Sequence, residues 1–166
     1  MTAVEVTDAG RVQLTLEPDE ARMLADLAEQ IEQLVTEAVD DPAFDRLFPP
    51  AYRDDAAASA EFDRFERAGL AEGKAGAART VMSGASGGDL AEGEPVRIEL
   101  DDHEIWAWMT HLTDVRLVLA ERLGIDADDG GFELDDEMAT LVPLYDWLGW
   151  LQAALVDALE STTEGA

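Results

Sequence analysis

The chain has 166 residues, of which 47% are hydrophobic, and we expect a single domain with one core over residues 1–166. Its 38 acidic residues outnumber 11 Lys plus Arg, and the formal charge of -27 repels phosphates, which argues against nucleic acids and anionic membranes as partners. The absence of cysteine excludes disulfides, thiolate nucleophiles and cysteine metal sites.

The acidic excess has three interpretations that the sequence leaves open. It can be a solvated shell that keeps the protein soluble, an adaptation to a salt-rich host, or a docking surface for a basic partner.

The first residues, MTAVEVTDAG, lack the basic start and the apolar run of a secretory signal. No segment approaches the roughly 18 apolar residues that a membrane span requires. We therefore expect a cytoplasmic protein.

Alternating apolar residues on both sides of Asp8-Ala9-Gly10 predict an N-terminal β-hairpin. They are Val4 and Val6 before the turn and Val12, Leu14 and Leu16 after it. Next, Glu17-Pro18-Asp19-Glu20 has the acids and the proline typical of a helix start. The helix is predicted to end near Asp40-Asp41-Pro42 and has these apolar residues at helical spacing: Leu24, Leu27, Ile31, Leu34 and Val35.

Four further segments follow this first helix. RLFPPAYRDD, from Arg46 to Asp55, contains two prolines and predicts a turn. Ala56 to Leu70 and Lys74 to Met82 predict two short helices. Ser83 to Pro95 is rich in Gly and Ser and predicts a mobile loop, without the glycine and lysine spacing of a phosphate-binding loop.

A second strand-and-helix unit begins at residue 96. Residues 96–100 alternate as a strand, Asp101 and Asp102 can cap a helix, and Gly124 can end it. The apolar stripe of this helix is Ile105, Met109, Leu112, Val115, Leu119 and Leu123. The unit repeats the first one at an offset of 84 residues, and true duplication and chance recurrence both stay open. A duplication would place both strands in one small sheet.

A last helix is predicted from Glu137 to Glu160, with Pro143 in its first turn or bending it, and residues 161–166 are expected to form a flexible tail. This helix is apolar around much of its circumference, so it is either central to the core or half of an interface. The whole pattern predicts an α+β, predominantly α, fold. It has about five helices, the last two long ones packed together, and a two- or three-stranded sheet from the hairpin and the 96–100 strand.

DADDGGFELDDE, from Asp126 to Glu137, has the length and several of the acids of a calcium-binding EF-hand loop. However, the fifth position is Gly130, which offers no side-chain ligand, and the usually apolar eighth position is Glu133. Partial matches are common in so acidic a chain. We interpret the segment as an acidic loop in which Asp135 or Asp136 caps the last helix, and we predict no metal site.

The two histidines do not form an evident active site. His103 and His111 are eight residues apart on one predicted helix, too far for joint metal binding, which uses a spacing of four. His111 has Asp114 one turn on and could be an oriented base, but no Ser, Thr or Cys nucleophile is suggested beside it. A structural role is favoured for His111, and no catalytic or cofactor-binding residue is predicted.

An aromatic and arginine set is the best candidate for an interaction surface. Arg116 lies between apolar positions of its helix, which predicts a structural ion pair with a carboxylate, with partner recognition as the alternative. Trp108 is expected close to the core, whereas other tryptophans should lie toward its edge. They can fill the core or anchor a partner, since Trp is enriched at protein interfaces. The candidate surface is Trp106, Arg116, Trp147 and Trp150.

Several segments resemble an actinobacterial family catalogued as domain of unknown function 2017. They are the opening strand-helix unit, RLFPPAYRDD, LTDVRLVLAERLGI (Leu112 to Ile125) and YDWLGWLQAALVDAL (Tyr145 to Leu159). Members are often encoded beside the adaptor that delivers substrates to the Clp protease, so the resemblance implies a link to regulated proteolysis. Some members have been labelled transcriptional regulators. The family brings no active-site pattern, and therefore no catalytic residues.

The sequence thus favours a non-enzymatic interaction or regulatory protein without a cofactor, with the Clp adaptor or its chaperone as the expected partner. A small-molecule-binding or hydrolytic domain is the first alternative. A transcriptional regulator is the second, and the net charge disfavours it. The oligomeric state stays open.

Overall fold

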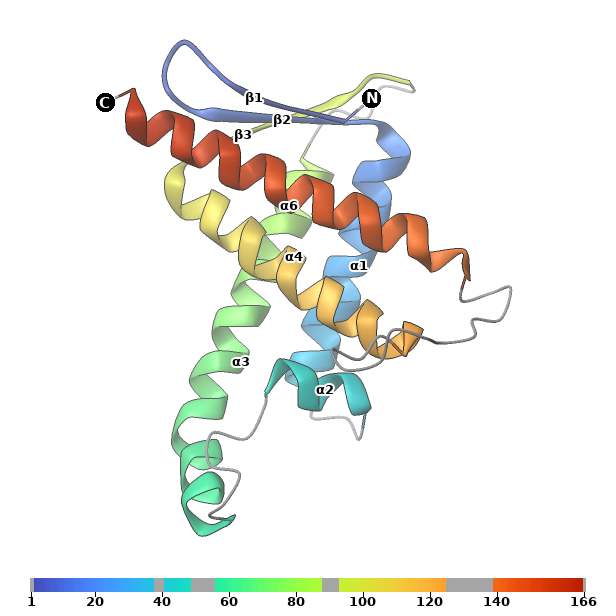
Figure 1. Ribbon diagram of the computed structural model, residues 1–166, viewed down its shortest axis with the longest axis vertical. Coiled ribbons are helices and arrows are strands. Elements are labelled where there is room, and N and C mark those ends of the chain that lie inside the picture. The colour runs from blue at the N-terminus through green and yellow to red at the C-terminus, as the bar shows by residue number, and fades with distance from the viewer. Residues whose placement is uncertain (1, 38–40, 49–55, 88–92, 125–138, 166) are drawn as a thin grey trace.

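The computed structural model describes residues 2–37, 41–48, 56–87, 93–124 and 139–165 (Figure 1). Its strands and helices in chain order are β1 (Ala3–Val6), β2 (Val12–Leu16), α1 (Pro18–Thr36), α2 (Pro42–Leu47), α3 (Ala56–Ser86), β3 (Val96–Leu100), α4 (Asp102–Leu123) and α6 (Leu141–Glu164). Within the described ranges, five helices and one three-stranded antiparallel sheet confirm the predicted α+β, predominantly α, class.

The sheet has the order β1-β2-β3, and β2 is antiparallel to both neighbours. Leu14 of β2 lies opposite Val4 of β1 and Ile98 of β3. Alternate residues of β2 and β3 are buried in the core, as the period of two predicts. Gly10 lies in the hairpin turn with a φ of 75°, which glycine adopts without a Cβ clash. The predicted hairpin and third strand are both confirmed.

Helix α1 begins at Pro18, as predicted, and the Glu17 N–H donates to Glu20 Oε2 over 2.8 Å. One stripe of the helix is buried: Ala21, Leu24, Ala28, Ile31 and Val35. The helix ends at Thr36, earlier than the predicted end near Asp40-Asp41-Pro42. One reason for the earlier end is that Asp41 caps the next helix, α2 (Pro42–Leu47).

Helix α2 is a short helix that the sequence pattern did not predict. Asp41 begins it, because its Oδ1 accepts a hydrogen bond from the Ala43 N–H over 2.9 Å. The helix ends at Leu47, so Arg46 and Leu47 are helical rather than the start of the predicted turn. Residues 49–55 of that turn lie outside the described residues.

A single helix, α3, replaces the two short helices predicted between residues 56 and 82. It runs through Gly73 and continues over Ser83–Ser86, so the predicted loop begins after Ser86 instead of at Ser83. A glycine inside a helix costs about 1 kcal/mol relative to alanine. Packing on α1 offsets this cost, since the most extensive contact between two helices is that of α3 with α1. The side chains that α3 buries are mostly small: Ala75, Ala77, Ala78, Val81 and Ala85.

Helix α4 is central, since it contacts α1, α2, α3 and α6 (Figure 1). Asp101 caps it by accepting from the Glu104 N–H over 2.8 Å, and Gly124 ends it with a φ of 69°, both as predicted. The helix buries residues around much of its circumference, including His111 and Asp114. The centre of the core is therefore occupied by α4 and not by the last helix.

Helix α6 lies along α4 and runs in the opposite direction (Figure 1). It begins at Leu141 instead of Glu137, which places Pro143 in its first turn as predicted, and it continues to Glu164, four residues beyond the predicted end at Glu160. Its buried residues are Leu148, Leu151, Leu155 and Ala158. The opposite side of α6 stays at the surface, so this helix covers α4 and confirms that the two last long helices pack together.

Candidate functional site

A groove of about 770 Å³ lies on the surface between α4 and α6. Helix α4 contributes Trp106, whose side chain is 61% exposed, and α6 contributes Val156, which is 39% exposed. Met109 of α4 is buried and also lines the groove. The other lining residues are Thr110, Thr113, Gln152, Leu159, Glu160, Thr163 and Glu164. An exposed tryptophan next to an apolar groove is the arrangement typical of a binding surface.

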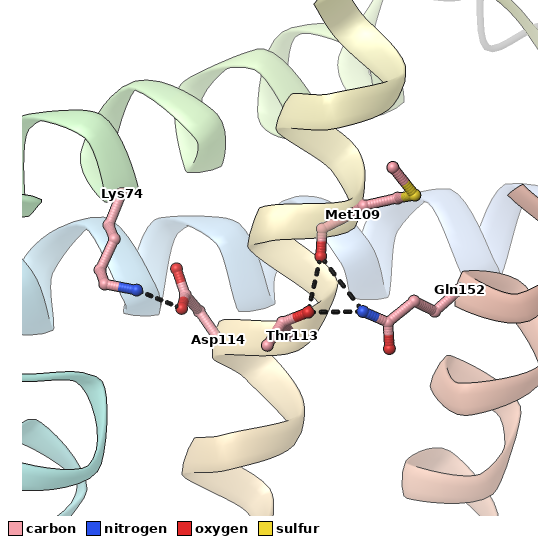
Figure 2. A network of polar contacts seen from close by, with 5 residues as sticks. All are labelled: Lys74, Met109, Thr113, Asp114 and Gln152. Atoms are coloured by element: carbon pink, nitrogen blue, oxygen red, sulfur yellow. Dashed lines mark hydrogen bonds and ion pairs between the residues drawn. The ribbon is translucent and has the colours of Figure 1, made fainter. Parts of the chain in front are cut away.

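A hydrogen-bond network ties the two helices together at one end of this groove (Figure 2). The Gln152 amide Nε2 donates to Thr113 Oγ1 and, over 3.4 Å, to the Met109 carbonyl oxygen. The Thr113 hydroxyl donates to the same carbonyl over 2.9 Å. Because Gln152 belongs to α6 and the other two residues to α4, the network fixes how the helices lie against each other.

The opposite end of the groove is acidic. Glu160 and Glu164 lie there on the last two turns of α6, near Trp106 of α4. They are four residues apart and so lie on the same side of the helix. Neither Lys nor Arg lines the groove among the described residues. The polar part of the groove wall thus consists of carboxylates, threonine hydroxyls and one amide.

Arg116 lies one turn of α4 beyond Thr113, and its guanidinium packs on an aromatic ring instead of a carboxylate. Its Cζ is 4.3 Å from the centre of the Tyr145 ring. A Cβ on Gly149 would lie 3.1 Å from that Cζ, so the glycine leaves the space that the guanidinium fills. Within the described part of the chain, Arg116 forms no ion pair. The predicted ion pair of Arg116 is replaced by this cation–π contact.

The structure does not bring the four residues of the candidate surface into one patch. Trp106 lines the groove, and Arg116 lies on the same contact line between α4 and α6. Trp150 is 49% exposed, but it precedes Gln152 by two residues, about 200° around the helix, so it lies on the opposite side of α6. Trp147 is half-buried and packs on the core. Trp108 is fully buried, in agreement with its predicted place near the core.

Sequence reasoning missed several groove residues, above all Gln152, Val156 and Thr163. The sequence contains a signal for the polar contact at one end of the groove. Gln152 and Thr113 are polar residues inside otherwise apolar helical segments, and such residues often bond across a helix pair. The pattern does not reveal which helices pair, however, and so it could not predict a groove.

A second polar cluster is buried beneath α4 (Figure 2). Lys74 Nζ of α3 lies 2.7 Å from Asp114 Oδ1, and the Asp114 side chain is only 2% exposed. Burial raises the pKa of the Asp114 carboxyl, while the hydrogen bond from Lys74 acts in the opposite direction. This ion pair joins α3 to α4, and the nearby Phe48 ring centre lies 6.0 Å from Lys74 Nζ. Its burial and its partners indicate a structural role.

His111 is fully buried, one turn before Asp114, but it is not bonded to that carboxylate. Neither of its ring nitrogens has a hydrogen-bond partner among the described residues. Burial lowers the pKa of His111 to about 4, so the ring is neutral at pH 7. An oriented base needs a partner and access to solvent. His111 is closed to solvent and has no partner in the described part of the chain, which supports the structural role favoured from the sequence. His103 is exposed in the first turn of α4.

Two further cavities are described, and neither brings a histidine into its wall. One of about 700 Å³ lies between α1, α4 and α6, with the Asp41–Arg122 ion pair of 2.7 Å at its side. The other, of about 650 Å³, lies between α3, β3 and α4 and is lined by Arg79, Arg97 and Glu104, among others. Burial and the neighbouring Asp101 carboxylate raise the pKa of Glu104.

The described ranges contain neither a metal-binding cluster nor a membrane-spanning helix. No three His, Asp or Glu side chains there come close enough together to hold a metal ion. The EF-hand-like segment and its capping residues Asp135 and Asp136 lie outside the described residues. No helix in these ranges is long and apolar enough to cross a membrane.

The chain was compared with known families, curated proteins and solved structures. A family described as "Domain of unknown function (DUF2017)" matches residues 1–159, which is nearly the whole chain. No curated protein matches the chain, and no solved structure matches it either.

Proposed function

This chain belongs to the DUF2017 family, and on that premise we propose that it is a non-enzymatic interaction protein that binds a partner protein through the α4–α6 groove. The observation that carries the proposal is the exposed Trp106 at an apolar groove whose opposite wall holds Val156. Burial of a tryptophan in a partner supplies much of the binding energy at protein interfaces. An exposed Trp106 side chain lowers the solubility of the free protein, and a bound partner would bury it away from water.

The lining of the α4–α6 groove favours binding over catalysis. Among the described residues, the groove wall contains threonine hydroxyls and carboxylates but no histidine, lysine or arginine that could activate a nucleophile or stabilise an oxyanion. The buried His111 and Asp114 face the core of the protein and are closed to a substrate. The groove volume also falls within the range of small-molecule sites, roughly 300–1,000 Å³. A small apolar ligand is therefore the second candidate, and it competes for the same residues.

The identity of the partner comes from the family resemblance. The adaptor of the Clp protease and its chaperone are the first candidates, in the cytoplasm of an actinobacterium, and the protein would then regulate proteolysis. The alternative of a transcriptional regulator requires DNA binding, which the formal charge of -27 opposes.

The test is an affinity purification from native cytoplasm, washed at high salt, with three tagged baits: wild type, Trp106→Ala and Trp150→Ala. Trp150 is the matched control, since it is a similarly exposed tryptophan on the other side of α6. We expect the Clp adaptor or chaperone with wild type and Trp150→Ala, and at least tenfold less with Trp106→Ala.

Circular dichroism should show that all three baits fold alike, because Trp106 is largely exposed. Equal recovery of every retained protein by the three baits would overturn the proposal. Recovery of no protein, combined with a metabolite that binds wild type but not Trp106→Ala, would establish the small-ligand alternative in its place.

A further inference from the structure

We infer that the α4–α6 groove receives a basic amphipathic helix of the partner, with its apolar side chains against Met109 and Val156 and its cations over Glu160 and Glu164. This inference rests on the proposed function and specifies the chemistry of the partner. Three features of the groove support it: the position of the two carboxylates, the length and composition of its walls, and the charge of the whole chain.

The two carboxylates lie where negative charge is unfavourable. Glu160 and Glu164 are one helical turn apart, so they repel each other. They also lie in the last two turns of α6, where the helix dipole is negative, and α6 has no basic residue in its last turn. Neither forms an ion pair with a described residue. A cation from a partner would relieve both sources of repulsion.

The groove fits a short helix. Along α6 it extends from Gln152 to Glu164, a span of thirteen residues and about 18 Å of helix. A partner helix of about three turns matches this length, with apolar anchors at positions i, i+3 or i+4, and i+7. In the described part of the chain, the lining residues come from α4 and α6 and from no strand, so an extended peptide would find no strand edge there for its backbone hydrogen bonds. A helix satisfies these bonds internally.

Charge complementarity distinguishes a basic helix from a second copy of this chain. Two copies would each bring a formal charge of -27 to the contact, and the carboxylates of one groove would face an acidic surface. A basic helix meets the opposite sign. The described wall residues offer hydrogen-bond acceptors, and none of them is a Lys or Arg that would repel a basic helix. The acidic surface would also speed its association.

Two synthetic helical peptides without tryptophan test the inference. They share the same apolar positions, and their polar face carries either Lys and Arg or Glu. Binding is measured by the anisotropy of a fluorescein label. We expect the basic peptide to bind at least tenfold more tightly than the acidic one, and Trp106→Ala to weaken its binding at least tenfold.

A charge-matched pair of variants shows where the cations bind. Glu160→Gln/Glu164→Gln and Asp26→Asn/Glu29→Gln each remove two negative charges, but Asp26 and Glu29 are exposed on α1, which does not line the groove. We expect the first variant to weaken binding of the basic peptide at least fivefold and to flatten its salt dependence, and the second to change affinity less than twofold.

Equal loss of affinity in the two double variants would overturn the inference, because the attraction would then come from net charge alone. Equal binding of both peptides, lost in Trp106→Ala, would also overturn it and leave the proposed function intact. So would a concentration-dependent dimer, seen by sedimentation velocity and abolished by Trp106→Ala, because the groove would then bind a second copy. Binding of neither peptide would exclude a basic helix, and the affinity purification would still decide the proposed function.

Discussion

At the scale of single residues, His111 is the clearest case of a titratable group that the fold holds neutral. Its side chain is fully buried in α4, and its nitrogens have no hydrogen-bond partner among the described residues. Burial lowers its pKa from 6.5 to about 4, because a buried imidazolium would lose its hydration without gaining a partner. Protonation and the native packing of α4 are therefore in conflict.

This conflict predicts that acid destabilises the protein through His111. Between pH 6.5 and about 4 the unfolded chain binds a proton at this histidine that the folded chain does not. The free energy of unfolding should therefore decrease as the pH is lowered from 6.5 to about 4, by up to about 1.4 kcal/mol per pH unit and on the order of 3 kcal/mol in total. Urea unfolding of wild type and His111→Leu at pH 7 and pH 4.5 measures it.

The difference between the two proteins isolates His111 from other titrating groups. Asp114, one turn on, has a raised pKa and acts in the opposite direction, but it is present in both. We expect the acid-induced loss to be smaller in His111→Leu. His103→Gln, which removes the exposed histidine, should behave as wild type. Parallel pH profiles for wild type and His111→Leu would show that the imidazole is protonated in the fold without penalty.

At the scale of elements, one cation–π contact between α4 and α6 depends on a glycine. Arg116 of α4 reaches the Tyr145 ring across the space at Gly149, where a Cβ would lie 3.1 Å from two guanidinium atoms. A methyl group there forces Arg116 to move away from the ring. The cation–π contact is worth about 1 kcal/mol, which is close to what alanine gains over glycine inside a helix.

We therefore predict different outcomes for the same substitution at two helical glycines. Gly73→Ala in α3 meets no atom of a described residue within 4 Å of its new Cβ, so it should stabilise the protein by about 1 kcal/mol. Gly149→Ala should gain nothing or lose stability, as measured by urea unfolding. In an Arg116→Met background the two substitutions should stabilise by similar amounts. A full gain for Gly149→Ala in the wild type would show that Arg116 contributes nothing at the ring.

The elements differ in how far the sequence predicts them, for physical reasons. The β1–β2 hairpin, α1 and α4 have regular apolar spacing and local turn or cap residues, so each can be predicted from its own stretch of sequence. Helix α3 has a glycine at its middle and small side chains, and its continuity comes from packing on α1. The aromatic partner of Arg116 lies in another helix, and a pattern along one helix cannot identify it.

The same limit applies to the candidate site. The exposure of Trp106 could be predicted, because the position of a tryptophan at the edge of an apolar stripe is a local property. Its separation from Trp147 and Trp150 could not, because it depends on how α6 is rotated against α4. That rotation is set by the buried stripe Leu148, Leu151 and Leu155 together with the Gln152 to Thr113 hydrogen bond.

At the scale of the whole molecule, like charge dominates the surface. Eleven basic residues can neutralise only a minority of 38 acids. The ion pairs that do form include buried or half-buried ones, such as Lys74–Asp114 and Arg46–Glu121, which salt screens only weakly. Most remaining carboxylates repel each other through solvent, where screening is effective. Added salt should therefore remove more repulsion than attraction.

Salt should then have opposite effects on folding and on binding. Between 50 and 500 mM NaCl at pH 7 we expect the melting temperature to rise by several degrees, since 1 kcal/mol corresponds to about 2–4 °C for a chain of this size. Over the same range, affinity for the basic peptide should fall, because the attraction is screened. Thermal scans by circular dichroism measure the first effect. Near the isoelectric point of about 4.1 the stabilisation should disappear, since the net charge is then close to zero. A melting temperature that falls with salt at pH 7 would mean that the ion pairs outweigh the repulsion, and that the acidic surface costs the fold little.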